Sequence, residues 1–163
     1  MILLVGGNAR NVGKTTLVKN IIAATRDTNW VAVKISGHPH GDARPRLPKH
    51  AKPPATELFA EAGAAETFLL HETPEERMKF DALADSGRPL IVESNRAVEW
   101  VRGEFAYLFV WDPEAENAKP RERWHLEKAA WVLPPRQDPD PALLAWITTR
   151  ISDWRDRPGR TGS

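Results

Sequence analysis

The stretch MILLVGGNARNVGKTT, residues 1–16, joins an apolar run to a glycine-bearing loop that ends in Gly13-Lys14-Thr15. The apolar run from Ile2 to Val5 predicts a short buried strand, which we expect to break at Gly6-Gly7. Apolar residues at helical spacing follow the loop and predict a helix. A strand, a glycine-bearing loop, Gly-Lys-Thr and a helix form the context that a phosphate-binding loop, or P-loop, requires.

The loop differs from the common P-loop pattern in its length. The common pattern has a glycine five residues before the glycine of Gly-Lys-Thr, and Asn8 holds this position here. Counted from Gly7, the loop keeps its first glycine and is one residue longer. A glycine-rich turn that only caps the helix is the alternative interpretation, and the flanking strand and helix patterns favour the P-loop.

A loop of this kind binds an anion through its backbone N–H groups and through the dipole of the following helix. Lys14 would reach the β- and γ-phosphates of a nucleoside triphosphate and act in catalysis, and the Thr15 hydroxyl would hold Mg²⁺. Arg10 can either clamp a phosphate or point to solvent. The predicted nucleotide-binding residues are Gly7, Asn8, Arg10, Asn11, Val12, Gly13, Lys14, Thr15, Thr16 and Lys34.

Strand and helix patterns alternate along the rest of the chain. The expected strands are 30–35, 67–70, 89–92, 106–111 and 129–133, and the later helices are 56–62, 74–85, 114–128 (broken near Pro120) and 141–154. Near-continuous apolar strands between helices predict an α/β fold: a three-layer P-loop NTPase fold with a mostly parallel central sheet and helices on both faces. We expect a single nucleotide-binding domain over 1–154 and a disordered tail over 155–163.

Three charged residues, Lys34, Glu93 and Asp112, fall at the carboxyl ends of predicted strands, where sheets of this kind bind ligands. If the strand of Glu93 lies beside the first strand, its carboxylate faces the phosphate site and acts as a metal ligand and catalytic group. An ordinary surface position is the alternative for Glu93. Lys34 either meets a phosphate oxygen or extends to water. Asp112, followed by Pro113, is expected to form a turn.

The segment 37–54 is long, polar and rich in Pro, His, Lys and Arg, which predicts a mobile functional loop. Within it, His38, His40 and Asp42 alternate along the chain, a spacing that can place them on one side of an extended segment around a metal ion. A solvated loop is the favoured interpretation, because proline and glycine leave the local geometry open and no distant ligand can be named.

Composition limits the classes of partner. The 163-residue chain has a formal net charge of +1, so no strong field directs it to nucleic acid or to a membrane surface. It has no cysteine, which excludes disulfides and thiolate chemistry and suits a reducing compartment. No apolar run has the length of a membrane span, and the first residues lack the pattern of a signal peptide. We therefore expect a cytoplasmic protein.

Several segments, in matching order, resemble the MobB proteins, which are adaptors of molybdopterin-guanine dinucleotide biosynthesis and belong to the SIMIBI class of P-loop NTPases. The resemblance rests on the P-loop, on Val31-Ala32-Val33-Lys34 with histidines beyond it, on the helical segment ATELFAEAGA before a small strand, and on Ile91-Val92-Glu93. Two positions differ from the family pattern: Ser94 replaces a glycine, and Ala55-Thr56 replaces Asp-Thr or Asp-Ser.

The resemblance implies Mg²⁺-dependent binding of GTP or ATP, slow hydrolysis with Glu93 holding a metal-bound or attacking water, and a homodimer that works beside a partner biosynthetic enzyme. The longer loop and Lys34 also resemble dethiobiotin synthetase, which implies an ATP-dependent synthetase or small-molecule kinase. A non-catalytic module that binds nucleotide is the third interpretation. The base stays open between guanine and adenine, because the guanine signature Asn-Lys-x-Asp is absent after 129–133 and many SIMIBI proteins lack it.

Overall fold

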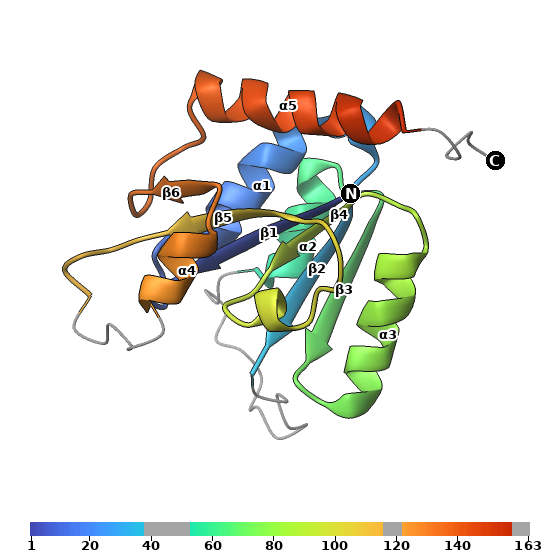
Figure 1. Cartoon of the computed structure of the whole chain (residues 1–163), viewed down its shortest axis with the longest axis horizontal. Helices are drawn as coiled ribbons and strands as arrows, with labels where there is room; N and C mark the ends of the chain where they lie inside the picture. Colours follow the sequence, from blue (N-terminus) through green and yellow to red (C-terminus); the bar gives the residue numbers. More distant parts are fainter. Residues whose placement is uncertain (38–52, 116–121, 158–163) are drawn as a thin grey trace.

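The computed structural model describes residues 1–37, 53–115 and 122–157, which form one central sheet between two layers of helices (Figure 1). The strands are β1 (Ile2–Gly7), β2 (Val31–Ser36), β3 (Glu66–His71), β4 (Leu90–Glu93), β5 (Ala106–Val110) and β6 (Trp131–Leu133). The helices are α1 (Lys14–Ala24), α2 (Ala55–Ala62), α3 (Pro74–Asp85), α4 (Glu122–Lys128) and α5 (Pro141–Arg155), with two 3₁₀ turns, η1 (Arg26–Thr28) and η2 (Ala97–Glu99).

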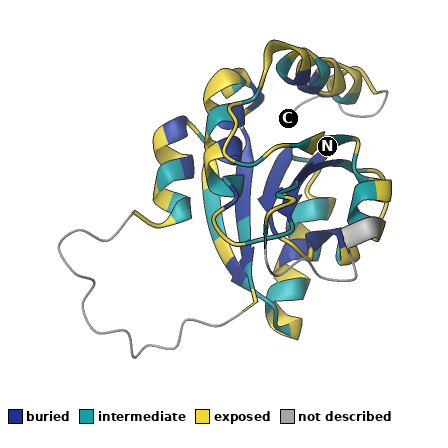
Figure 2. Cartoon of the chain, turned by 90° about the vertical axis from the view of Figure 1, so that its left-hand side faces the viewer, coloured by how far each residue is buried: buried dark blue, intermediate teal, exposed yellow. Residues whose placement is uncertain are grey.

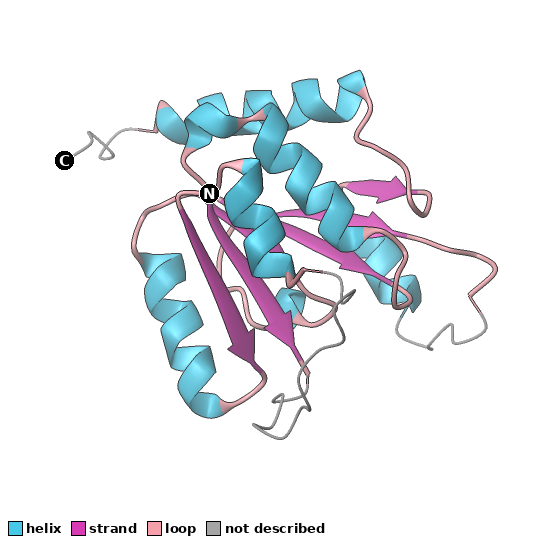
Figure 3. Ribbon diagram, turned by 180° about the vertical axis from the view of Figure 1, so that it is seen from behind, coloured by secondary structure: helices cyan, strands magenta, loops and turns pink. Residues whose placement is uncertain are grey.

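The sheet has the strand order β3-β2-β4-β1-β5-β6, and every pairing is parallel (Figure 3). This confirms the expected α/β fold with a parallel sheet. β1 lies between β4 and β5, and β4 also pairs with β2. The carboxyl ends of β1, β2 and β4 therefore lie side by side, which is the arrangement on which the predicted site depends.

Alternate residues along each strand pack into two separate cores, one on each face of the sheet. Leu3 and Val5 of β1 face α1, α2 and α5, whereas Ile2 and Leu4 face α3, η2 and α4. Figure 2 shows the central strands as the most deeply buried part of the fold. A parallel sheet covered on both faces requires apolar residues at successive strand positions, and the sequence has them.

β1 continues through the two glycines where the sequence pattern predicted a break. A Cβ on Gly6 would collide with the phenol of Tyr107, and a Cβ on Gly7 would lie 3.0 Å from the carbonyl oxygen of Val110. Both neighbours belong to β5, which pairs with β1 up to Gly7. The prediction was wrong because these glycines admit a neighbouring strand and its side chains, and do not turn the chain.

The other elements follow the predictions with small shifts at their ends. Thr73 caps α3, accepting a hydrogen bond from the N–H of Glu76 at 3.3 Å, and Gly63 ends α2 in the left-handed conformation, as expected. The helix predicted over 114–128 is wrong at its start, because residues 112–115 form a turn in which the Asp112 carboxylate accepts from the N–H of Glu114 at 3.0 Å. Residues 116–121, including the expected break at Pro120, lie outside the described residues.

At the far end of the chain, α5 continues to Arg155, one residue beyond the expected helix. Leu143, Ile147 and Ile151 form its buried face. Arg157 forms an ion pair with Glu104 at 2.6 Å, so the first residues of the expected tail are described together with the domain. Among the described residues, none of the helices has the length and apolar character needed to cross a bilayer.

Candidate functional site

The candidate site lies where the carboxyl ends of β1, β2 and β4 meet the start of α1. In the strand register Lys34 is opposite Glu93, and Glu93 is opposite Val5, two residues before the end of β1. The condition set by the sequence is therefore met: the strand of Glu93 lies beside the first strand. This brings the loop of residues 8–13, Lys34 and Glu93 to one edge of the sheet.

Glu93 is the centre of the site and is only 4% exposed. One carboxylate oxygen accepts a hydrogen bond from the Thr15 hydroxyl at 2.8 Å, and the other accepts from the Lys34 ammonium at 2.5 Å. The Lys34 side chain is 29% exposed, so it reaches from the sheet toward solvent. A buried carboxylate is stable only with such partners, and the contacts exclude an ordinary surface position for Glu93.

Lys14 extends back over the loop, and its ammonium donates to the carbonyl oxygen of Ala9 at 2.7 Å. Burial lowers the pKa of Lys14 below its usual value; the charge of Glu93 opposes this shift and the charge of Lys34 adds to it. Two lysines and one carboxylate thus share the site. The excess of positive charge favours an anion as its ligand.

The backbone of the loop presents N–H groups that donate to none of the residues that the structure describes. Within the part of the chain that the structure describes, no N–H from Ala9 to Thr16 donates to an acceptor, whereas the next one, that of Leu17, donates to the Gly13 carbonyl at 2.9 Å. Asn11 and Gly13 have left-handed backbones, with φ of 61° and 103°. Where left-handed residues alternate with right-handed ones, successive N–H groups turn to one side, an arrangement that can bind an anion.

Asn8 ties the start of the loop to the end of β5. Its side-chain amide donates to the carbonyl of Asp112 at 2.7 Å and accepts from the N–H of Asp112 at 2.9 Å, while its own N–H donates to Val110 at 3.2 Å. All of these groups are therefore used within the protein. The Asn8 side chain therefore holds the start of the loop in place, and the backbone of Asp112, at the expected turn, provides the groups to which it bonds.

Two further contacts that the sequence did not indicate position the loop. The Asn95 side chain, just beyond β4, accepts from the N–H of Gly7 at 3.2 Å. Arg136, between β6 and α5, donates its N–H to the carbonyl of Val12 at 2.8 Å and lies so close that a Cβ on Gly13 would be 3.0 Å from its Cα. The sequence around Arg136 carries no pattern that marks this contact. Its left-handed backbone, with φ of 57°, is known only from the structure.

The remaining predicted site residues differ in how far their side chains are exposed. Arg10 and Thr16 are exposed at the mouth of the loop, and Arg10 forms no hydrogen bond or ion pair with the described residues. The Val12 side chain is buried in the core on the α1 face, so only its backbone can meet a ligand. His38, His40 and Asp42 lie outside the described residues. Within residues 1–37, 53–115 and 122–157, no three His, Cys, Asp or Glu side chains gather as metal ligands.

The donor set fits magnesium held together with a phosphate. Thr15 and Glu93 offer a hydroxyl and a carboxylate, the hard oxygen ligands that Mg²⁺ prefers, and Mg²⁺ in proteins is commonly bound by one or two carboxylates plus substrate phosphates. Comparison of the chain with protein-family models, with curated proteins and with solved structures finds no match.

Proposed function

We propose that this chain is a P-loop nucleoside-triphosphate-binding protein of the SIMIBI class, and that it binds ATP or GTP with Mg²⁺ between β1 and α1. The proposal rests on the buried Glu93 carboxylate, which contacts Thr15 and Lys34 beside a loop whose N–H groups, from Ala9 to Thr16, donate to no acceptor among the described residues. A turn that only capped α1 would need neither a buried carboxylate beside Thr15 nor a lysine held across the loop.

Each group has a role in this proposal that follows from its position. The N–H groups of the loop and the Lys14 ammonium bind the β- and γ-phosphates, and they stabilise the charge that develops on a transferred phosphoryl group. Lys14 exchanges its bond to the Ala9 carbonyl for a phosphate oxygen. Thr15 and Glu93 hold Mg²⁺, which neutralises phosphate charge when it is bound.

Within this class, the resemblance to MobB supports an accessory protein of molybdopterin-type cofactor biosynthesis, a cytoplasmic homodimer that hydrolyses nucleotide slowly and works beside a partner enzyme. The departure at Ser94 has a local explanation. Ser94 is buried, and its hydroxyl accepts from the N–H groups of Arg96 and Ala97 at 3.0 and 3.1 Å, which fixes the start of η2. The serine therefore stabilises the chain after Glu93 and leaves the carboxylate in place.

One observation favours a second function, an ATP-dependent synthetase or small-molecule kinase. Lys34 belongs to β2, which pairs with β4 on the edge opposite to β1. Lys34 contacts Glu93 from there, and its side chain is partly exposed. A lysine in this place can hold the anionic group of an acceptor next to the γ-phosphate. If neither reaction occurs, the site is that of a non-catalytic module that binds nucleotide.

Nucleotide turnover separates these functions. Purified protein is incubated with Mg·ATP or Mg·GTP, with and without carboxylate, amine and hydroxyl acceptors, and nucleoside diphosphate is measured for the wild type and for Lys14→Ala. Slow acceptor-independent release that Lys14→Ala abolishes supports the accessory NTPase, and release that requires an acceptor selects the synthetase. Absence of turnover together with absence of a thermal shift on adding either nucleotide would overturn the proposal.

A further inference from the structure

A cavity of 620 Å³ lies at the amino edge of the sheet, the edge opposite the Gly-Lys-Thr loop. Its walls come from the start of β1, the C-terminal end of α3, the segment before β5, and α5 with the residues just after it, from Trp146 to Arg157. β1 begins at this cavity and ends at the loop, so the two places are separated by the length of one strand, about 20 Å at 3.3 Å per residue. The cavity is therefore a separate feature of the molecule.

The volume and the apolar part of the lining suit a small organic molecule. Ligand sites of this kind commonly measure about 300–1,000 Å³, with apolar and aromatic walls and a few polar groups. Met1 and Ile2 supply aliphatic surface here, and Phe105, Trp146 and Trp154 supply aromatic surface. Such walls favour a flat, apolar ring over a flexible polar ligand.

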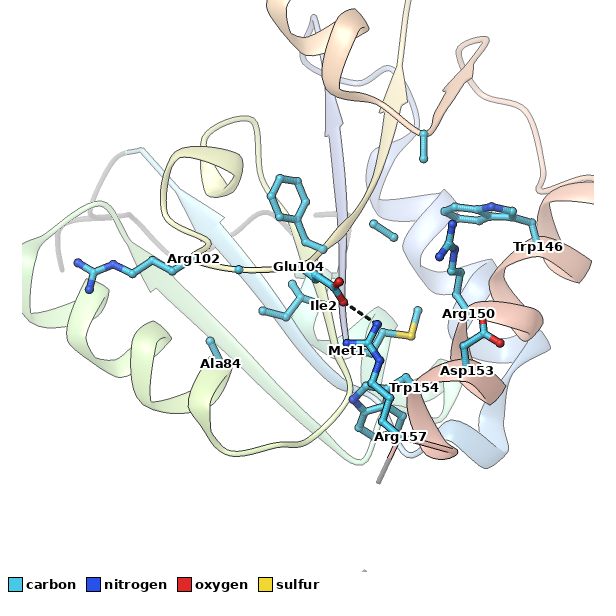
Figure 4. Close-up of a pocket in the computed structure, with 14 residues that line it drawn as sticks. Met1, Ile2, Ala84, Arg102, Glu104, Trp146, Arg150, Asp153, Trp154 and Arg157 are labelled. Carbon is cyan, nitrogen blue, oxygen red and sulfur yellow. Dashed lines mark ion pairs between the residues drawn. The ribbon is translucent and has the colours of Figure 1, made fainter. Parts of the chain in front are cut away.

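The charged groups of the cavity favour a negative ligand. Arg102, Arg150 and Arg157 line it, against two carboxylates, those of Glu104 and Asp153. Arg157 is already paired with Glu104 at 2.6 Å. The guanidinium of Arg150 instead lies over the ring of Trp146, 5.4 Å from its centre, and has no ion pair with any described residue (Figure 4).

This arrangement leaves one guanidinium that is positioned by an aromatic ring and open to an anion. The Trp146 ring is itself fixed by an edge contact with Trp131, with 6.1 Å between the ring centres. Because Arg150 is held by stacking, less side-chain freedom is lost when it binds a carboxylate, sulfonate or phosphate. We propose that this cavity binds a small aromatic anion, with the ring against the apolar walls and the charged group on Arg150.

Three probes separate the ring from the charge. Naphthalene-1-sulfonate has both, 1-naphthalenemethanol has the ring without the charge, and methanesulfonate has the charge without the ring. Each is titrated into the full chain by calorimetry and by backbone amide NMR. We expect naphthalene-1-sulfonate to bind one site at least about ten-fold more tightly than either partial probe, since a charge-assisted hydrogen bond contributes that much, with shifts at the start of β1 and along α5.

Variants with opposite expected signs test the assignment. Arg150→Gln should weaken naphthalene-1-sulfonate about ten-fold, and Arg150→Lys should recover part of the loss. Glu104→Gln should tighten binding, because it removes a carboxylate from the mouth and releases Arg157. Arg155→Gln, on the same helix but outside the cavity, is the control and should bind as the wild type does.

The proposal is overturned if the uncharged naphthalene binds as tightly as the sulfonate, if Arg150→Gln leaves the affinity unchanged, or if the amide shifts fall outside the cavity. These results are independent of the nucleotide site, because no nucleotide is added and none of the substituted residues lies near the Gly-Lys-Thr loop.

Discussion

Replacing Glu93 with glutamine removes one charge from the candidate site and leaves its shape almost unchanged. The carboxylate accepts two charge-assisted hydrogen bonds, one from the Thr15 hydroxyl and one from the Lys34 ammonium. The glutamine oxygen can still accept from Lys34, while its NH₂ group must turn toward Thr15, whose hydroxyl then accepts in place of donating. The folded protein loses the ion pair and keeps a hydrogen-bonded network.

The loss of folding stability in Glu93→Gln can be estimated from the burial of the two partners. A hydrogen bond to a charged group contributes about 1.5–3 kcal/mol to stability. Lys34 is 29% exposed and recovers part of this by hydration, so Glu93→Gln should cost about 2 kcal/mol. For a chain of this size each kcal/mol shifts Tm by about 2–4 °C, and the variant should melt about 4–8 °C below the wild type.

Glu93→Gln should change the affinity for ATP in opposite directions without and with Mg²⁺, which a purely structural role of Glu93 would not produce. Without metal, the Glu93 charge repels a triphosphate, so Glu93→Gln should bind ATP in EDTA more tightly than the wild type does. With Mg²⁺ the order should reverse, because the variant loses a group that holds the ion, and loss even of a group that only orients a metal ligand commonly costs about 10- to 100-fold in metal affinity.

Calorimetric titration of each protein with ATP, in EDTA and in excess Mg²⁺, measures both effects. Glu72→Gln is the matched control, since Glu72 follows β3 and pairs with Arg96 at 2.6 Å, whereas Thr15 and Lys34 both bond to Glu93. Its gain in affinity on adding Mg²⁺ should equal that of the wild type. If Glu93→Gln also keeps the full gain, our assignment of Glu93 as a metal-holding group is refuted.

Three further outcomes are expected. Gly13→Ala should lower Tm more than Gly103→Ala, because both change a left-handed glycine but only Gly13 lies against a backbone, that of Arg136; equal shifts would contradict this. Asn8→Ala should cost about 1–2 kcal/mol in denaturant unfolding and weaken nucleotide binding, because two hydrogen bonds to the chain after β5 are lost. Burial lowers the pKa of Lys14, so ATP affinity should fall as pH rises from neutrality toward 10.5, and this slope should be absent in Lys14→Met.

The fold was largely predictable because its strands and helices have clear local patterns. Apolar runs at successive positions mark strands buried on both faces, and caps such as Thr73 and Gly63 mark helix ends. The error at Gly6-Gly7 has a tertiary cause: these glycines lie against Tyr107 and Val110 of another strand, a requirement that no local window contains.

Part of the candidate site was predictable from a general rule about where the ends of parallel strands lie. Carboxyl ends of parallel strands meet at one edge, so Lys34 and Glu93 could be placed near the loop before any contact was known. Asn95 and Arg136 could not be found in this way. Each lies far from the loop in sequence and reaches it only through the sheet order and the chain between β6 and α5, so their contacts required the fold.

The phosphate site is tested most directly by equilibrium binding of Mg·ATP and Mg·GTP to the wild type, to Lys14→Ala and to Lys19→Ala, which removes an exposed lysine from the same helix. We predict that the wild type and Lys19→Ala bind at least one nucleotide at one site with equal affinity, and that Lys14→Ala binds it at least about ten-fold more weakly, as expected for a lost charge-assisted bond to phosphate. Equal binding by all three proteins, or binding by none, would contradict the assignment of the loop as a phosphate site.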